Sequence, residues 1–356
     1  MTEKNNTGSE RVQEYYVGMD VHKGKWVITI RCCGFALKTL VVDPSVEVLM
    51  KYLERNFPGG KFTCTYEAGF CGFWIARELK KRGVECLVVN PADVPTRDKE
   101  RVNKKDKVDS RKLARELEKG NLEGIYIPDE WMQRLKSLGR LSISCGRDMT
   151  RIKNRIKSHL HLYGIEIPSH SECYHWSGNF IRALEGMCRK CDPFGDYMNA
   201  CIEKLKAERA RQAGLLKKLR GYANSCGWGE ILGRLISIPG IGFKTAITLM
   251  TEIEDMRRFK DLDSLCSFVG LIPSCGGSGD REMDFGITRR HNTYLRYLLV
   301  EAAWVIVRKD KVLLETYSKF LSRMTKQNAI IRIAKKLLGR IRYVWLNNKD
   351  YAYCKV

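Results

Sequence analysis

Four acidic residues in the first third of the chain have the types and positions that metal-assisted chemistry on a phosphodiester requires. Asp20 interrupts an apolar strand pattern, YYVGMDVHKGKWVITI, at residues 15–30. Burying an isolated carboxylate is costly unless a cation or metal ion lies against it. Glu67 closes a second apolar strand, and Asp106 and Asp109 stand three residues apart at a helix start, where they share one face.

Carboxylates packed together would repel one another and raise each other's pKa. Two Mg²⁺ ions would relieve this repulsion, activate a hydroxyl or water, and stabilise the leaving oxygen at a phosphodiester. Each acid also has an ordinary alternative: Asp106 and Asp109 as helix-cap residues, and Glu67 as a surface residue at a strand end. Asp20 is the hardest to explain in that way, because its flanks are apolar.

The elements that would position these acids form an α/β unit over residues 15–128, after a polar tail at 1–14. Hydrophobic periodicity and glycine stops predict three strands, a helix, a strand, a helix, a strand and a helix. Their expected ranges are 15–21, 25–33, 35–42, 46–57, 61–68, 70–83, 84–90 and 109–120. This order is typical of the ribonuclease H fold, in which the first and fourth strands are neighbours. A Rossmann fold is less favoured, because no glycine-rich turn follows the first strand.

Residues 129–228 read as mainly helical and could form an antiparallel helical hairpin or coiled coil. Arg147, Arg151 and Arg155 are among the basic residues along this region. A basic helix of this kind could hold a phosphate backbone, or it could be an ordinary solvated face. Residues 229–356 are expected to form a second compact, largely helical domain.

Two stretches of this last domain stand out. SIPGIGFKTA, residues 237–246, resembles a helix-hairpin-helix element whose backbone N–H groups bind phosphate, with Gly240, Gly242 and Lys244 as contacts. The alternative is a plain tight turn between packed helices. The segment 270–296 is rich in glycine and serine around Ser278, but taken alone it reads as an ordinary mobile loop.

The composition favours a polyanionic partner. Lysine and arginine outnumber the acids 63 to 41 in 356 residues, which gives a formal charge of +22.

The N-terminus lacks an apolar signal region and no apolar run approaches the roughly 20 residues of a membrane span, so a cytoplasmic, nucleoid-associated protein without a membrane partner is expected. The 14 cysteines are scattered. A zinc site built from Cys173, His175, Cys188 and Cys191 matches no known ligand spacing well, and ordinary packing is favoured.

Together these features resemble the DEDD transposases of the IS-110 type of insertion sequence, which are recombinases guided by a "bridge" RNA. The resemblance covers nearly the whole chain. The motifs that carry it are GMDVHK at 18–23, YEAG at 66–69, KKDKVDSRKLA at 104–114, IPGIGFKTA at 238–246, FVGLIPS at 268–274 and GITRRHNTYLR at 286–296.

The resemblance implies a RuvC-like first domain whose four acids, Asp20, Glu67, Asp106 and Asp109, bind Mg²⁺. It also implies a C-terminal serine that attacks DNA and forms a covalent link. Counting back from GITRR places this serine at Ser278, with Ser274 as the fallback, because Gly277 and Asp280 depart from the usual pattern. The implied partners are donor and target DNA, a guide RNA, and further copies of the chain in a dimer or tetramer.

The sequence therefore predicts a Mg²⁺-dependent DNA recombinase. One alternative is a structure-specific, junction-resolving DNA nuclease that uses the same acids with water as the nucleophile. Another is a nucleic-acid-binding protein with a degenerate site. The residues expected to contact nucleic acid are Lys104, Lys105, Lys107, Arg111, Arg147, Arg151, Arg155, Gly240, Gly242, Lys244, Arg289 and Arg290.

Overall fold

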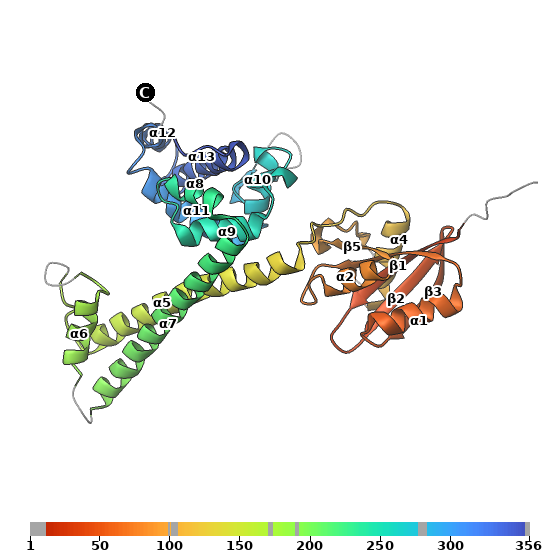
Figure 1. The fold of residues 1–356 in the computed structure, drawn as a ribbon, viewed down its shortest axis with the longest axis horizontal. Coiled ribbons are helices and arrows are strands. Elements are labelled where there is room, and N and C mark those ends of the chain that lie inside the picture. Colours follow the sequence, from red (N-terminus) through yellow and green to blue (C-terminus); the bar gives the residue numbers. More distant parts are fainter. Residues whose placement is uncertain are drawn as a thin grey trace, which may run out of the picture. The chain divides into compact units, whose positions relative to one another are not determined.

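The computed structural model describes residues 12–98, 100, 106–169, 174–188, 192–276 and 283–352. The chain divides into two compact units, Met1–Ile127 and Pro128–Val356, and each is described by itself (Figure 1). The first unit contains a five-stranded sheet, and the second is mostly helical.

The sheet of the N-terminal unit has the strand order β3-β2-β1-β4-β5. Its strands are β1 (Glu14–Val21), β2 (Trp26–Cys32), β3 (Phe35–Val42), β4 (Lys61–Glu67) and β5 (Glu85–Val89). The first three pair antiparallel, whereas β4 pairs parallel with both β1 and β5. The predicted meander followed by parallel additions is therefore confirmed, and β1 lies next to β4 as expected.

The helices of this unit lie on both faces of the sheet (Figure 1). They are α1 (Val46–Asn56), α2 (Trp74–Lys81) and α4 (Asp106–Glu118), with a short 3₁₀ turn, η1, at Pro91–Asp93. Val17 and Met19 of β1 are fully buried in a core shared with α1 and α2. Because side chains alternate along a strand, Gly18 and Asp20 point to the opposite face, where α4 packs.

Helix α4 and strand β1 approach each other closely at Gly18. A Cβ at this position would lie 2.2 Å from the backbone nitrogen of Ala114 and 2.3 Å from the carbonyl oxygen of Ser110. Beside it, the buried hydroxyls of Thr29 and Ser110 lie 2.9 Å apart and form a hydrogen bond. Glycine in GMDVHK thus allows the helix that carries Asp106 and Asp109 to contact the central strand.

We expect Gly18→Ala to destabilise the protein by about 3 kcal/mol, because the backbone of α4 must move to admit the methyl group. Chemical denaturation would measure this loss. Gly24→Ala is the matched control, since a Cβ at Gly24 meets no atom within 4 Å. Equal stability of the two variants would contradict the close contact between α4 and β1.

The C-terminal unit begins with two long helices, α5 (Glu130–Leu162) and α7 (Pro193–Ser225). They run antiparallel and side by side, with α6 (Gly178–Gly186) near the end where α5 finishes and α7 begins (Figure 1). Ile156, Leu160 and Leu205 are fully buried in a small core shared with α6. The helical hairpin considered from the sequence is therefore present.

The remaining helices pack around a larger core that includes Leu299, Ile333 and Leu337. They are α8 (Gly229–Ser237), α9 (Phe243–Ile253), α10 (Leu262–Val269), α11 (Thr293–Ile306), α12 (Lys311–Leu321) and α13 (Lys326–Asn347), with a 3₁₀ turn, η2, at Met256–Arg258. Among the described residues, no helix combines the length and apolar character needed to cross a membrane.

The segment 270–296, which the sequence analysis interpreted as a loop, contains two short strands. Strands β6 (Pro273–Gly276) and β7 (Met283–Ile287) pair antiparallel, so two parts of the glycine-rich segment 270–296 are strands. Glycine and serine are poor strand formers, which is why composition alone suggested a loop.

Candidate active site

The strand register places two of the predicted acids side by side. Met19 of β1 pairs with Tyr66 of β4 in the parallel ladder, and the next residue along each strand is Asp20 or Glu67. Asp20 follows Gly18 by two residues on β1, and Glu67 follows the buried Thr65 by two residues on β4. Both side chains therefore lie on the face of the sheet that α4 covers. Helix α4 begins at Asp106, so Asp106 and Asp109 occupy its first turn.

Asp20, His22 and Asp106 form the closest part of this cluster. His22 Nε2 lies 3.2 Å from Asp20 Oδ2 and 3.7 Å from Asp106 Oδ1. Burial raises the pKa of Asp20, the neighbouring His22 opposes this shift, and the charges of Asp106 and Asp109 add to it. Asp20 is therefore a partly buried carboxylate, 22% exposed, in a field of other acids.

Two lysines partly balance the four carboxylates. Lys25 Nζ lies 2.9 Å from Asp106 Oδ2, and this contact lowers the pKa of Asp106. Lys112 Nζ lies 3.3 Å from Glu67 Oε1 and 3.4 Å from Asp109 Oδ1. Sequence reasoning missed Lys112 in this role, although its position three residues after Asp109 indicates a shared helix face.

The carboxylates of this cluster suit a hard divalent cation. Ligand atoms of Asp20, His22 and Asp106 all lie within 4.8 Å of one another, the only such group of three among the residues described. Carboxylate oxygens are the usual protein ligands of Mg²⁺, which keeps several waters. Burial is the main cause of the raised pKa of Asp20, and the repulsion from Asp106 and Asp109 that adds to it is an interaction that a bound cation would relieve.

The basic residues expected near this cluster have different surroundings. Lys107 is exposed. Arg111 is exposed too, but its Nε donates to Thr39 Oγ1 on β3 at 3.2 Å. Lys104 and Lys105 lie outside the described residues.

The predicted serine site is described only at its edges. Ser278 falls between β6 and β7, outside the described residues, and Ser274 lies within β6, where only the backbone is described. Arg289 and Arg290, just after β7, are exposed. The adjoining turn packs tightly, since a Cβ at Gly270 would lie 2.1 Å from His291 Cβ.

The glycine hairpin between α8 and α9 has a packing function at its first glycine. Gly240 has a φ of 91°, and a Cβ there would lie 2.6 Å from the carbonyl oxygen of Ala302 on α11. Gly242, by contrast, is exposed immediately before α9. Lys244 follows in the first turn of α9, and burial lowers its pKa.

The basic face of α5 is only partly solvated. Arg151 is exposed and contacts Asp148 on its own helix, and Arg155 is exposed. The guanidinium carbon of Arg147 lies 5.4 Å from the ring centroid of Tyr294 on α11. These positions leave Arg147 and Arg155 accessible to a phosphate.

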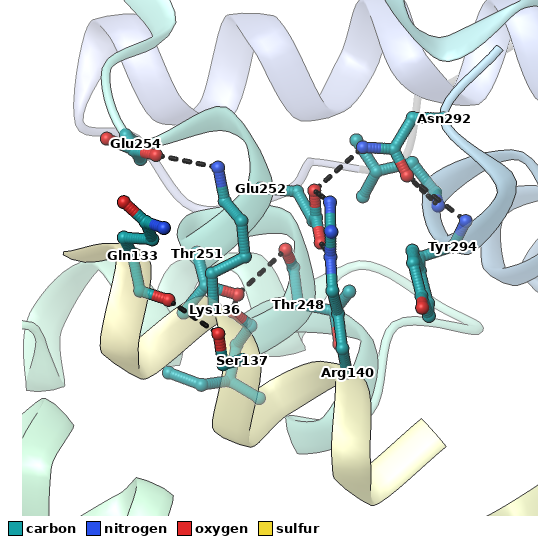
Figure 2. Close-up of polar contacts among 12 residues, drawn as sticks. Gln133, Lys136, Ser137, Arg140, Thr248, Thr251, Glu252, Glu254, Asn292 and Tyr294 are labelled. Atoms are coloured by element: carbon teal, nitrogen blue, oxygen red, sulfur yellow. Dashed lines mark hydrogen bonds and ion pairs between the residues drawn. The ribbon is translucent and has the colours of Figure 1, made fainter. Parts of the chain in front are cut away.

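Arg140, on the same helix, is instead held by the C-terminal core. Figure 2 shows its guanidinium beside Glu252 of α9, with Nε–Oε1 and Nη2–Oε2 distances of 2.6 and 2.8 Å. Asn292, the N-cap of α11, donates to Glu252 Oε2 at 2.8 Å. This three-residue network joins α5, α9 and the start of α11, and no sequence motif indicated it.

The cysteine and histidine positions considered for zinc are not brought together among the described residues. His175 Nε2 lies 3.1 Å from the carbonyl oxygen of Pro168, and Cys188 Sγ donates to the Leu184 carbonyl at 3.3 Å. Cys173 and Cys191 lie outside the described part of the chain.

Comparisons with known proteins agree with the geometry of both units. A family profile for DEDD transposases of the IS110 type matches residues 17–165, which include all four acids. A second profile, described as the transposase IS116/IS110/IS902 family, matches residues 232–318, which include the glycine hairpin and the β6–β7 segment.

Curated relatives are similar along most of their length. A Sinorhizobium fredii protein named as a transposase, y4qE, is 26% identical over 307 residues, which cover 84% of this chain and 74% of the relative. A second one from the same organism, y4rJ, is 26% identical and covers 91% of this chain and 89% of the relative. The transposase for insertion sequence element IS1111A of Coxiella burnetii is 23% identical over 76% of this chain and 73% of its own. The chain thus belongs to the IS110 family of DEDD transposases, enzymes that cleave and rejoin DNA.

Proposed function

We propose that this transposase cleaves DNA with two parts of the chain: the four-acid cluster of the N-terminal unit and a serine in the β6–β7 segment. The observation that carries the first part is the convergence of Asp20 and Glu67 at adjacent strand ends with Asp106 and Asp109 in the first turn of α4. The serine rests on the motif order around Ser278 and on the family profile that matches residues 232–318.

In this mechanism the four carboxylates hold Mg²⁺, which when bound supplies positive charge at the scissile phosphate and at the leaving oxygen. The Ser278 Oγ attacks phosphorus and gives up its proton to water, and the bond from phosphorus to the leaving oxygen breaks. The leaving oxygen takes up a proton from water and is released as a hydroxyl end. A hydroxyl from another strand then attacks the phosphoserine, which rejoins DNA and regenerates Ser278 without ATP.

The proposed partners are donor and target DNA together with a structured guide RNA. The formal charge of +22 supports more than one nucleic-acid surface. As the resemblance to the family implies, we also propose that the chain acts within a dimer or tetramer.

Arg147 and Lys244 are proposed to contact a phosphate backbone. Arg147 lies against Tyr294, and Lys244 Nζ would lie 3.8 Å from a Cβ at the neighbouring Gly146, so both groups belong to one region between α5 and α9. Burial already lowers the pKa of Lys244, and a phosphate would favour its charged form.

We expect Arg147→Ala/Lys244→Ala to weaken DNA binding uniformly across sequences and to reduce the slope of log K against log salt by about 2. Fluorescence anisotropy over a salt series measures this slope. Arg134→Ala on α5 is the matched control, because this exposed arginine already contacts Glu130. Equal slopes for the wild type and the double variant would remove both residues from the interface.

The nucleophile is tested by searching for protein joined covalently to DNA. Wild type, Ser278→Ala and Ser274→Ala would be incubated with Mg²⁺, labelled donor and target DNA, and RNA transcribed from the flanking element. We expect an adduct in the wild type and Ser274→Ala, and none in Ser278→Ala. Loss only in Ser274→Ala would move the nucleophile to that residue. Nicked DNA without any adduct, unaffected by either change, would indicate a nuclease that uses water.

A further inference from the structure

Lys112 is the most deeply buried charged group in the acid cluster. Its side chain is 8% exposed, and its ammonium lies between Glu67 on β4 and Asp109 on α4, at 3.3 and 3.4 Å. The neighbouring Ser110, Leu113 and Ala114 are buried as well, so this face of α4 lies against the sheet. Burying an ammonium group is costly unless carboxylates lie beside it, as Glu67 and Asp109 do here.

The two lysines of the cluster differ in their freedom to move. Lys25 is 52% exposed and its partner Asp106 is 40% exposed, so water screens their contact and Lys25 can turn outward. Lys112 has its backbone inside a helix and its ammonium enclosed by the carboxylates that it contacts. A cation that approaches Glu67 and Asp109 must therefore compete with a fixed positive charge.

The charge of the cluster fits one divalent ion better than two. Lys25 and Lys112 leave two of the four negative charges unbalanced when His22 is neutral, and one Mg²⁺ would balance them. The contacts of Lys112 are with Glu67 and Asp109. The other part of the cluster consists of Asp20, His22 and Asp106, whose ligand atoms lie within 4.8 Å of one another.

We propose that Lys112 occupies the second cation position of this site. Its ammonium takes the place of a metal ion between Glu67 and Asp109, so the protein without DNA binds one divalent ion, on the Asp20–Asp106 side. Lys112 is thus a positioning residue that holds two ligands apart from their metal until its ammonium is withdrawn. This inference rests on the four-acid metal site proposed above.

The test counts the ions bound to the full-length protein without DNA, with Mn²⁺ followed by electron paramagnetic resonance. We expect one tightly bound ion in the wild type. In Lys112→Met we expect a second ion whose dissociation constant is at least about tenfold lower than that of any second ion in the wild type. Lys112→Arg retains the charge and should keep the count at one. Lys119→Met, a change of an exposed lysine at the end of α4, is the matched control and should also give one.

A second measurement separates this function from a merely structural one. Loss of Lys112 leaves Glu67 and Asp109 facing each other, so the melting temperature of Lys112→Met should fall in EDTA and recover in Mn²⁺. An equal loss under both conditions would mark a lysine needed only for packing, and would overturn the inference.

The outcomes also distinguish this inference from the proposed metal site itself. Two tightly bound Mn²⁺ ions in the wild type, or one in Lys112→Met, would overturn the assignment of Lys112. The four-acid metal site would still stand if Asp20→Asn weakened Mn²⁺ binding. No tight ion in the wild type, with Asp20→Asn unchanged, would overturn the metal site and the inference together.

Discussion

Asp20→Asn is expected to lower Mg²⁺-dependent DNA cleavage by at least about 10³-fold, because loss of a metal ligand removes several kcal/mol of stabilisation from the transition state. The same change should leave the melting temperature in EDTA equal or higher. Burial and the charges of Asp106 and Asp109 raise the pKa of Asp20, so above that pKa the ionised carboxylate costs the folded protein free energy. Asparagine has nearly the same shape without this charge. Cleavage assays and thermal melts in EDTA and Mg²⁺ measure both effects.

The control for this prediction is Asp43→Asn, a change of an exposed acid in the same unit. It should cleave like the wild type and keep the rise in melting temperature that Mg²⁺ causes by binding the folded state. Asp20→Asn should lose most of that rise. A variant that cleaved normally would contradict the ligand role of Asp20. A variant that lost its stability in EDTA would show instead that Asp20 holds the fold together.

Much of the N-terminal fold was predictable because its signals are local. Alternating or continuous apolar runs mark the strands, and glycine follows α2 and α4. Strand order then brings Asp20 and Glu67 together, since parallel neighbours align their ends. What the pattern did not reveal was the environment of Lys112. In KKDKVDSRKLA every basic residue carries the same positive charge, and burial against the sheet distinguishes Lys112 from the exposed Lys107 and Arg111.

The C-terminal unit was less predictable because its polar contacts join distant parts of the chain. Arg140 and Glu252 are separated by 112 positions, and each is surrounded by ordinary helical sequence. The sequence does not distinguish Arg140 from the other basic residues of its helix, yet Arg140 contacts a carboxylate that is 1% exposed. The glycine hairpin shows the same difficulty, since Gly240 is required by its contact with Ala302 of α11.

Arg140→Met is expected to destabilise the C-terminal unit by about 3 kcal/mol, since it leaves the buried carboxylate of Glu252 with the Asn292 amide as its remaining side-chain donor among the described residues. This value lies at the lower end of the loss expected when a buried ion pair is broken, because the Arg140 side chain is 42% exposed and water screens its side of the pair. Hydrogen exchange of the backbone amides in α9 and α11 measures the loss where it occurs.

The decisive comparison is the double variant Arg140→Met/Glu252→Gln. The amide of glutamine removes the buried charge but still accepts a hydrogen bond from Asn292, so the double variant should be more stable than Arg140→Met alone. Arg134→Met, at an exposed arginine of the same helix, should change the stability by less than about 0.5 kcal/mol. If the double variant lost as much as the sum of its single changes, the pair would not be coupled, and α5 would be held to α9 by its other contacts, among them the Lys136–Glu254 ion pair. If it regains stability, the buried charge of Glu252 is what makes Arg140 necessary, and the start of α11 beside the serine segment depends on a helix more than 100 positions away in the sequence.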